Sequence, residues 1–439
     1  MSSSKSVDRR APVQRALVIH PDREGRGSAR DADARLEEAV GLALALDLEI
    51  AERLVAPLRR LTPATLFGKG KVEEIGQLAE GLDATVVVVD DALTPVQQRN
   101  LEKAWQAKVI DRTGLILEIF ARRARTREGR LQVELARLSY ERSRLVRTWT
   151  HLERQRGGFG VMGGPGETQI ETDRRLISEK IGKLKRELTE VRRTRTLQRS
   201  ARKRVPYPTV ALVGYTNAGK STLFNRLTQA EVMAEDMLFA TLDPTLRMLK
   251  LPDGRPAILS DTVGFISDLP HELVEAFRAT LEEVREADVV LHVRDIASDE
   301  SQAQAQDVRA VLERLGVEMD KRRILEVWNK IDLLPAEDRE AVEGDARRAH
   351  PPAVAVSAVS GEGCPALLAT VAGLVDEAPP VDVHTPAGEG AAIAWLYSHG
   401  RVVDRDDGKD GAVRLSVSLS PQALGQFEQL FPQAMVVAH

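Results

Sequence analysis

The sequence is poor in cysteine, since Cys364 is the only one among its 439 residues. No intrachain disulfide is therefore possible, and a reducing compartment fits this usage. The chain also lacks any apolar run near the roughly 18 residues that a membrane-spanning helix requires. Its opening letters MSSSKSVDRR contain no apolar core of a secretory signal, and its closing letters MVVAH form no prenylation box. These absences predict a cytoplasmic protein with no membrane span.

The net charge of −4 hides a strong asymmetry along the chain. Residues 121–205 hold 24 Lys and Arg against 10 Asp and Glu, whereas the remainder holds 38 against 56. A basic block inside an acidic protein can be the electrostatic footprint of a nucleic-acid partner. Taken alone, however, such a charge run more often marks a solvated helical surface with scattered ion pairs.

The length predicts three or four domains, of which the first follows a disordered start at residues 1–12. Within residues 13–127, short β-rich runs alternate with helical stretches: ALVIH precedes DARLEEAVGLAL, and ATVVVVDD precedes TPVQQRNLEKAWQAK. This order predicts an N-terminal α/β domain with a buried parallel sheet. The letters GKGK at Gly68–Lys71 could hold a phosphate, but a basic turn at a helix start is the more frequent case. We assign no site there.

Residues 128–205 change character and show helical periodicity on both sides of a glycine-rich tract. Apolar residues recur at spacings of three and four before the tract, as in Leu131, Leu135 and Leu138, with Leu145 following an interruption at Arg142. The spacing returns after the tract, as in Leu184 and Leu188. Two such stripes joined by a loop predict an antiparallel helical hairpin with a coiled-coil-like seam. The tract at residues 157–166, GGFGVMGGPG, is then the tip of the hairpin.

Alternation of strands and helices resumes in residues 206–378, where TVALVG, RPAILSDT, DVVLHVRD, RILEVWNK and AVAVSA are the predicted strands. Residues 379–390 are rich in proline and glycine and predict a linker. Residues 391–439 combine AVRLSVSLS with the helix-like PQALGQFEQLF, which predicts a small α+β domain. The expected fold class is therefore α/β, with α/β and hairpin parts before the central domain and an α+β part after it.

The central domain contains a phosphate-binding motif directly after its first strand. The letters GYTNAGKST fit G-x-x-x-x-G-K-S/T and lie between the strand Val210–Val213 and the helix-like KSTLFNRL. Gly214 and Gly219 let backbone N–H groups surround phosphates at the start of the helix. Lys220 is expected to reach the β- and γ-phosphates, and the Ser221 hydroxyl to bind Mg²⁺.

Three further elements follow in the order that a GTPase requires. DTVG at Asp261–Gly264 closes a strand and brings a carboxylate near the metal and an amide near the γ-phosphate. NKID at Asn329–Asp332 closes another strand, and its last carboxylate can accept hydrogen bonds from guanine N1–H and the N2 amine, which adenine does not offer in this arrangement. SAVSG at Ser357–Gly361 closes a third strand and supplies backbone contacts to the base. The four elements predict GTP as the nucleotide.

The switch regions leave open questions that the motifs alone do not answer. FATLDPT, at Phe239–Thr245, lies where a first switch is expected, and both Thr241 and Thr245 could complete the Mg²⁺ shell. Phe265 follows DTVG at the place where Ras-type enzymes have a glutamine that orients water, so we expect slow hydrolysis by the isolated enzyme. Asn217 either holds K⁺, as in potassium-stimulated GTPases, or only forms hydrogen bonds within its loop.

Several stretches together resemble the HflX family of ribosome-associated GTPases. They are RTGLILEIFARRARTREGRLQVELARL at residues 112–138, GGPGETQIETDRRLI at 163–177, GYTNAGKSTLFNRLT at 214–228, FATLDPT, and DTVGFI at 261–266. The GTPase motifs alone would fit many relatives. The glycine tract followed by GETQIETDRR and then by the phosphate-binding loop is close to diagnostic of this family.

The resemblance implies a protein that binds the large ribosomal subunit, including its rRNA, and splits stalled or idle ribosomes under stress. It implies a hairpin whose tip approaches the peptidyl-transferase centre, and a first switch in which Thr241 binds Mg²⁺. Many family members have an arginine just before the Gly-Pro-Gly of the tip, whereas this chain has Gly163. We expect a monomer whose hydrolysis is stimulated by the ribosome.

The expected catalytic residues are Lys220, Gly264 and Thr241. The expected metal ligands are Ser221 and Thr241 for Mg²⁺ and Asp261 for Mg²⁺ through water, with Asn217 as the candidate ligand if K⁺ is bound. The expected contacts to GTP and GDP are Gly214, Tyr215, Thr216, Asn217, Ala218, Gly219, Lys220, Ser221, Thr222, Phe239, Ala240, Thr241, Leu242, Asp243, Asp261, Thr262, Val263, Gly264, Asn329, Lys330, Ile331, Asp332, Ser357, Ala358 and Val359.

Two other classes compete with this interpretation. A tRNA-modifying GTPase also has an apolar residue after its third motif, but it needs a reactive cysteine near its C-terminus, which this chain lacks. Cys364 lies beside the base-binding loop and fits a packing role better. A switch that acts only on a protein partner is the other alternative, and the basic hairpin argues against it.

Overall fold

The computed structural model describes residues 14–23, 31–155, 165–202, 207–229, 238–239, 245–267, 282–314, 316–317, 323–375, 381–408, 411–419 and 421–437. The predicted disordered start at residues 1–12 lies outside these ranges, as do residues 157–164 of the predicted hairpin tip. The chain divides into two compact units. Unit 1 comprises Met1–Arg195, Glu235–Asp243 and Ile266–Ala279, and unit 2 comprises Thr196–Ala234, Pro244–Phe265 and Thr280–His439.

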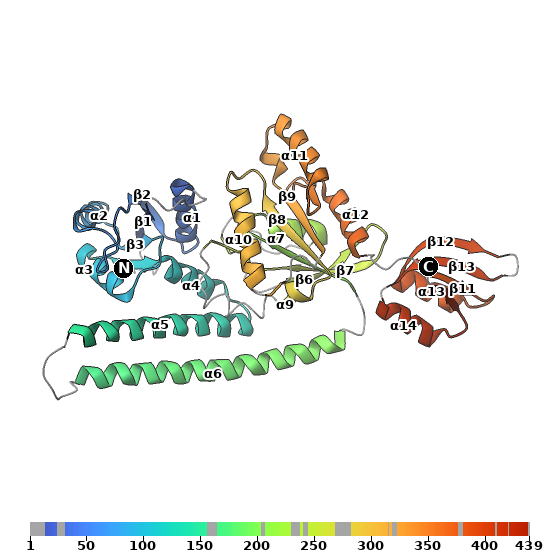
Figure 1. Cartoon of the computed structure of the whole chain (residues 1–439), viewed down its shortest axis with the longest axis horizontal. Helices are drawn as coiled ribbons and strands as arrows, with labels where there is room; N and C mark the ends of the chain where they lie inside the picture. Colours follow the sequence, from blue (N-terminus) through green and yellow to red (C-terminus); the bar gives the residue numbers. More distant parts are fainter. Residues whose placement is uncertain are drawn as a thin grey trace, which may run out of the picture. The chain divides into compact units, whose positions relative to one another are not determined.

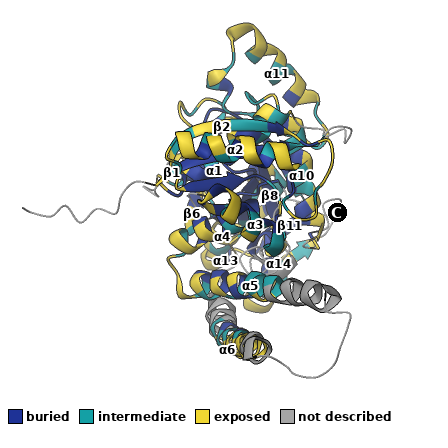
Figure 2. Ribbon diagram, turned by 90° about the vertical axis from the view of Figure 1, so that its left-hand side faces the viewer, coloured by how far each residue is buried: buried dark blue, intermediate teal, exposed yellow. Residues whose placement is uncertain are grey.

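Unit 1 begins with a four-stranded parallel sheet in the order β2-β1-β3-β4 (Figure 1). Its strands and helices are β1 Arg15–Asp22, α1 Ala32–Leu44, β2 Glu49–Pro57, α2 Lys69–Gly81, β3 Val86–Val89, α3 Pro95–Trp105, β4 Lys108–Asp111 and α4 Arg112–Arg123. Because helices cover a parallel sheet, the middle of its central strand β1 is apolar over Ala16–Ile19, and all four valines of the central strand β3 are buried. Figure 2 shows the contrast between the buried β1 and the largely exposed α2.

The strand β2 was not among the strands expected from the sequence. Its letters EIAERLVAP mix charged and apolar residues, and only Ala56 is fully buried. It occupies the edge of the sheet beside β1, where one side of the strand faces solvent. An edge strand of this kind shows no continuous apolar run, which explains why the sequence pattern did not reveal it.

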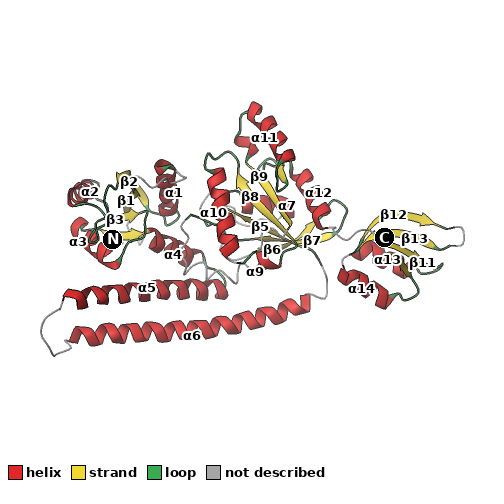
Figure 3. Ribbon diagram, viewed as in Figure 1, coloured by secondary structure: helices red, strands yellow, loops and turns green. Residues whose placement is uncertain are grey.

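The hairpin consists of α5 Arg127–Gln155 and α6 Pro165–Arg202, which run antiparallel (Figure 3). The expected apolar stripes are partly buried: Leu138 and Leu188 are 7% and 5% exposed. The α5 helix is attached to the N-terminal sheet through Asp111, which accepts hydrogen bonds from Tyr140 Oη at 2.6 Å and Arg144 at 3.3 Å. The root of the hairpin is therefore fixed by a buried carboxylate at the end of β4.

Unit 2 contains a six-stranded sheet in the order β10-β9-β8-β5-β7-β6, in which only the β6–β7 pair is antiparallel. Its elements are β5 Thr209–Gly214, α7 Lys220–Thr228, β6 Thr245–Lys250, β7 Pro256–Asp261, α9 Glu282–Glu286, β8 Val289–Asp295, α10 Ser301–Arg314, β9 Arg323–Asn329, the 3-10 turn η2 Ile331–Leu333, α11 Ala336–Arg348, β10 Ala353–Ala355 and α12 Cys364–Val375. Parallel strands place their carboxyl ends at one edge, where all four nucleotide motifs begin.

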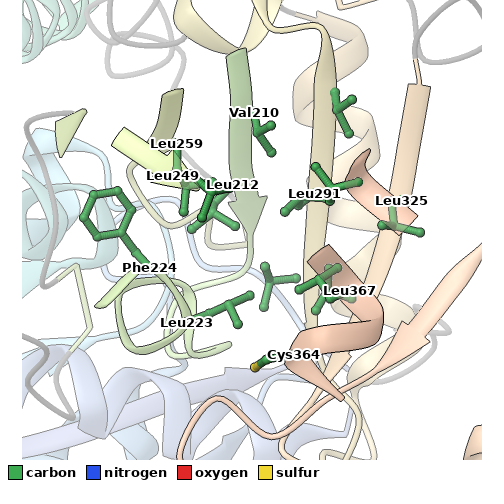
Figure 4. Packing of buried hydrophobic residues seen from close by; sticks show 14 of the residues in the cluster. Val210, Leu212, Leu223, Phe224, Leu249, Leu259, Leu291, Leu325, Cys364 and Leu367 are labelled. Carbon is green, nitrogen blue, oxygen red and sulfur yellow. The ribbon is translucent and has the colours of Figure 1, made fainter. Parts of the chain in front are cut away.

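One face of this sheet packs against α7 and α12 through a single apolar cluster. Figure 4 shows the cluster, in which Leu223 from α7 and Leu367 from α12 pack with Leu212 and Leu291 from the strands. All four side chains are at most 1% exposed. The packing fixes the start of α7, and therefore the phosphate-binding loop, against the rigid sheet.

A second sheet of unit 2 lies in the C-terminal part and has the order β12-β13-β11-β14, with antiparallel pairs throughout. Its elements are β11 Val381–Thr385, α13 Gly390–His399, β12 Arg401–Asp407, β13 Val413–Ser418, α14 Pro421–Leu430 and β14 Met435–Val437. This βαββαβ succession is the ferredoxin-like arrangement.

The predicted linker at residues 379–390 differs from the structure, because β11 lies within it. Val383 is fully buried, and β11 pairs with both β13 and β14 in the interior of the C-terminal sheet. The flanking prolines and glycines suggested a linker, while the three alternating inward residues of β11 were too few to show a strand. The expected fold class is confirmed, with α/β parts, a helical hairpin and a C-terminal α+β part. Within the described part of the chain, no helix is long and apolar enough to cross a membrane.

Candidate functional site

The phosphate-binding loop connects the carboxyl end of β5 to the start of α7. Gly214 has φ +155°, and a Cβ built on it would lie 2.2 Å from the Val293 carbonyl oxygen. Gly219 has φ +88°, and its Cβ would lie 2.2 Å from Asn329 Nδ2. Both positions therefore require glycine, the first through the neighbouring strand β8 and the second through the base-binding motif.

Lys220 is the first residue of α7 and is buried beneath the loop. Its Nζ donates hydrogen bonds to the carbonyl oxygens of Gly214 at 3.1 Å and Tyr215 at 2.6 Å. Burial lowers the pKa of Lys220 to about 8, and the nearby Asp261 carboxylate opposes this shift. A phosphate bound in the loop would favour the charged form of this amine, so nucleotide binding and protonation of Lys220 are linked.

Ser221 and Asp261 bring together the oxygen atoms expected to hold Mg²⁺. Ser221 Oγ donates a hydrogen bond to Asp261 Oδ2 at 2.8 Å, and Asp261 is fully buried at the end of β7. Hydroxyl and carboxylate oxygens are the ligands that Mg²⁺ prefers, usually together with phosphate oxygens and water. The pair therefore fits such an ion, and the described residues contain no group of three or more His, Cys, Asp or Glu that could hold a metal by themselves.

The DTVG segment pairs directly with the phosphate-binding loop. Phe265 N donates to the Gly214 carbonyl oxygen at 3.1 Å, and Thr216 N donates to the Phe265 carbonyl oxygen at 2.7 Å. A Cβ on Gly264 would lie 2.9 Å from Thr216 Cγ2 and 3.1 Å from Lys220 Nζ. Gly264 thus lies against the lysine, as its expected place beside the γ-phosphate requires. The Phe265 ring is 1% exposed and has no polar atom that could orient water.

Asn329 ties the phosphate end of the site to the base end. Its Nδ2 donates to the Ala218 carbonyl oxygen at 2.8 Å, and its Oδ1 accepts from Ala358 N at 2.9 Å. Lys330 has a left-handed backbone and forms an ion pair with Asp295 at 2.7 Å. Asp332 Oδ1 is buried and has no hydrogen-bond partner among the described residues. Such a carboxylate oxygen is costly to leave unsatisfied and suits a ligand that donates N–H groups.

The SAVSG loop is ordered by its own hydrogen bonds. Ser357 is fully buried, and its Oγ accepts from Ser360 N at 3.1 Å, while its carbonyl oxygen accepts from Gly361 N at 2.8 Å. Val359 projects outward and is 67% exposed. Cys364 is buried next to this loop, and burial raises the pKa of its thiol. A thiol in that state suits packing, as expected, and not nucleophilic catalysis.

The first switch lies largely outside the described residues. Ala240, Thr241, Leu242 and Asp243 all fall there, so their expected roles stay predictions. Phe239 belongs to unit 1, where its ring packs edge-on against Phe120 with 4.6 Å between the ring centroids. Asn217 is exposed with a left-handed backbone.

Two groups that the sequence did not single out also lie at the motifs. Arg226, in the last turn of α7, donates to the carbonyl oxygens of Ala358 and Val359. Arg112, at the start of α4, donates to Ser267 Oγ at 2.8 Å and to its carbonyl oxygen at 3.0 Å, within unit 1. Ser267 follows Gly264 by three residues. Both arginines donate to backbone carbonyl oxygens, which every residue has. No sequence motif therefore predicts these hydrogen bonds.

Three features define a P-loop GTPase: a glycine-lined loop around a buried lysine, a hydroxyl–carboxylate pair, and a carboxylate at the base end with one buried, unsatisfied oxygen. The family models that match the chain are "GTP-binding GTPase N-terminal" over residues 33–121, "GTP-binding GTPase Middle Region" over 123–202, "50S ribosome-binding GTPase" over 209–330 and "HflX C-terminal domain" over 345–434.

The sequence is similar along most of its length to curated relatives. It is 53% identical to the GTPase HflX of Magnetococcus marinus over 404 residues, covering 91% of each chain. It is 46% identical to the GTPase HflX of Escherichia coli over 387 residues, covering 88% of this chain and 89% of that one. A solved GTP-binding protein of Sulfolobus solfataricus in complex with GDP aligns with a TM-score of 0.44 at 24% identity, covering 83% of this chain and 99% of that chain. The chain belongs to the HflX family of GTPases, and it hydrolyses GTP to GDP and phosphate.

Proposed function

We propose that this GTPase binds the large ribosomal subunit, including its rRNA, and splits stalled or idle ribosomes under stress. The observation that carries the proposal is a strongly basic helical hairpin in the same chain as a GTPase domain. Family membership and the match of residues 209–330 to a "50S ribosome-binding GTPase" model support it. The GTP cycle supplies a switch, and the hairpin supplies a surface for RNA.

The hairpin presents its positive charge to solvent. Where side-chain burial is described on α6, the exposed basic residues are Arg174, Arg175, Lys180, Lys183, Lys185, Arg186 and Arg193. The ion pairs that some of them form, such as Arg175–Glu179 at 3.8 Å, lie on the surface and hold the side chains only weakly. RNA phosphates can therefore compete for these groups, and binding should weaken with salt through counterion release. Aromatic residues are sparse here, which favours structured RNA read by backbone and shape over stacked single strands.

Each residue of the GTPase site has its own expected role in binding the nucleotide. Lys220 and the loop amides would bind and orient the phosphates, and the Gly264 amide would contact the γ-phosphate. Ser221, Thr241 and Asp261 would hold Mg²⁺, which when bound neutralises charge on the β- and γ-phosphates. Asp332 would accept hydrogen bonds from guanine, and the 357–359 loop would contact the base. Asn217 remains a candidate K⁺ ligand.

Hydrolysis by the isolated chain should be slow, because Phe265 is buried and cannot orient the attacking water. We propose that the large subunit accelerates it by rearranging the segment around Gly264. A change of this kind would link GTP turnover to release of the protein from the ribosome. A single copy of the chain suffices for this cycle of binding, hydrolysis and release.

A charge-reversal experiment tests whether the hairpin binds RNA. Lys183→Glu with Arg186→Glu reverses two exposed charges on α6, and Arg347→Glu with Arg348→Glu makes the same change on the exposed helix α11. We expect the α6 variant to lose cosedimentation with large subunits and the α11 variant to keep it, both with normal GTP hydrolysis. Equal cosedimentation of the two variants would contradict an RNA-binding hairpin.

A second experiment tests the role of the glycine tract. Residues 157–166 are replaced by a Gly/Ser linker of equal length, and GTP hydrolysis, subunit binding and ribosome splitting are measured. We expect intact hydrolysis and lost splitting. Glycines let the native backbone enter a narrow cleft of folded RNA, but a linker with a different sequence should not fit that cleft. Full splitting activity would show that the tract is only a linker.

A further inference from the structure

Arg226 joins the helix that starts at the phosphates to the loop that contacts the base. It lies in the last turn of α7, whose first residue is Lys220. Its Nε donates to the Ala358 carbonyl oxygen at 3.2 Å, and a terminal guanidinium nitrogen donates to the Val359 carbonyl oxygen. A Cβ built on Gly361 would lie 3.8 Å from the guanidinium group, so the side chain also packs against the loop.

The remaining polar groups of the loop are held from other directions. Asn329 Oδ1 accepts from Ala358 N at 2.9 Å, and Ser357 Oγ accepts from Ser360 N at 3.1 Å. Val359 N lies between these two amides and has no hydrogen-bond partner among the described residues. It is therefore the amide of this turn that stays available to an acceptor.

The orientation of this amide depends on Arg226. In a planar trans peptide, the carbonyl oxygen of one residue and the N–H of the next point in opposite directions. The Ala358 carbonyl and the Val359 N–H belong to the same peptide, so the hydrogen bond from Arg226 to that carbonyl also fixes the direction of the N–H. The second bond, to the Val359 carbonyl, fixes the following peptide.

We propose that Arg226 is a positioning residue for guanine recognition, which holds the Val359 amide toward an acceptor on the six-position of the base. Guanine carries a carbonyl oxygen there, and adenine carries an amine that repels the N–H. Selectivity at this edge of the base adds to the contacts expected of Asp332 at N1 and N2. The guanidinium suits the task because its donors lie in one fixed plane and meet the two carbonyls in defined directions, whereas the rotating ammonium group of a lysine would hold them less rigidly.

The test measures GDP affinity together with that of a probe lacking the acceptor. The probe is the 5′-diphosphate of 2-aminopurine riboside, which keeps the N2 amine and has no oxygen at the six-position. It also lacks the N1–H that Asp332 would bind, but this loss is the same for every variant, so the comparison is made between proteins for one nucleotide at a time. Full-length wild type, Arg226→Ala, Arg226→Lys and the control Arg348→Ala are compared by titration calorimetry. Arg348 is exposed and pairs with Asp345 on its own helix, so its loss removes the same charge without touching the site.

We expect Arg226→Ala to lower GDP affinity by about tenfold to a hundredfold, in keeping with the loss of a charge-assisted hydrogen bond. Affinity for the 2-aminopurine probe should change less than threefold, so that the preference for GDP over the probe shrinks. Arg226→Lys should recover part of that preference, and Arg348→Ala should leave both affinities at wild-type values.

A purely structural arginine would give a different pattern. If Arg226→Ala lowered both affinities by the same factor, the residue would only stabilise the domain, and the proposal would be wrong. Unchanged affinity for GDP would overturn it equally. Because these measurements use nucleotide alone, their outcome is independent of whether the chain binds ribosomes.

Discussion

Arg112 offers the strongest test of how buried charge holds unit 1 together. The residue is 6% exposed, and its guanidinium donates to Asp90 Oδ1 at 2.5 Å, to Glu38, and to both oxygens of Ser267. Burial alone would lower the pKa of Arg112, but the carboxylates of Asp90 and Glu38 more than offset this, and the pKa lies above its ordinary value. The residue is therefore charged at every accessible pH and balances two buried anions.

Replacing Arg112 by alanine should destabilise the N-terminal sheet severely. Removal of one member of a buried ion pair typically costs about 3–5 kcal/mol, because the remaining charge is left uncompensated. Asp90 and Glu38 would both lose the guanidinium charge, although Asp90 keeps its contact with His20 and Glu38 keeps the hydrogen bond from Ser267, so we expect a value within that range. The control is Arg122→Ala, whose pair with Asp47 is 47% and 85% exposed and should be worth about 0–1 kcal/mol.

Hydrogen exchange of the full-length chain measures this effect locally. The amides of β3 at Val86–Val89 lie in a fully buried strand that ends next to Asp90, so their opening free energy reports on this part of the sheet. We expect a fall of several kcal/mol at these amides in Arg112→Ala and almost none in Arg122→Ala. Loss of less than about 1 kcal/mol in the Arg112 variant would refute the assignment of a structural ion pair.

Four further predictions concern the nucleotide site. Because burial lowers the pKa of Lys220 to about 8 and a phosphate would raise it again, GDP binding should take up a proton above pH 8. Affinity should then fall with rising pH, by at most about tenfold per unit, and calorimetry in buffers of different ionisation enthalpy would show no uptake if the shift is absent. Asp332→Asn should weaken GTP binding about tenfold or more and relax the rejection of xanthosine triphosphate; undiminished GTP affinity would show that another group reads the base. Cys364 should react slowly with a thiol reagent in the native protein and fully after unfolding, because its thiol is buried and its pKa raised; rapid native labelling would contradict that burial. Ser267→Val should raise GTP turnover in the absence of ribosomes, since it removes the hydroxyl shared by Arg112 and Glu38 and loosens the segment after Gly264 that we propose rearranges; an unchanged or lower rate would exclude a restraining role.

The elements that the sequence revealed are those whose residues face apolar surroundings on both sides or carry a complete motif. Strands such as β3 and β5 read as uninterrupted apolar runs, and the phosphate-binding loop has glycines at the two places where a Cβ would collide with a neighbour. Edge strands such as β2, and the short strand β11 between proline- and glycine-rich letters, gave no such signal.

The contacts of the site that the sequence did not predict join segments that are far apart along the chain and close together in the fold. Arg226 donates to carbonyl oxygens more than 130 residues away, and Arg112 reaches Ser267 over 155 residues. Every residue has a backbone carbonyl oxygen, so neither contact requires a particular sequence motif. Asp332, in contrast, lies in a short motif at a strand end, so the motif alone predicts its role in reading the base, and that role stays a prediction.

The most direct test of the central claim is GTP turnover measured with purified large subunits, with purified small subunits and without either. A protein that couples its GTPase site to the large subunit should show a slow basal rate, a many-fold increase with large subunits, and none with small subunits. Equal turnover in all three mixtures would contradict the proposed function.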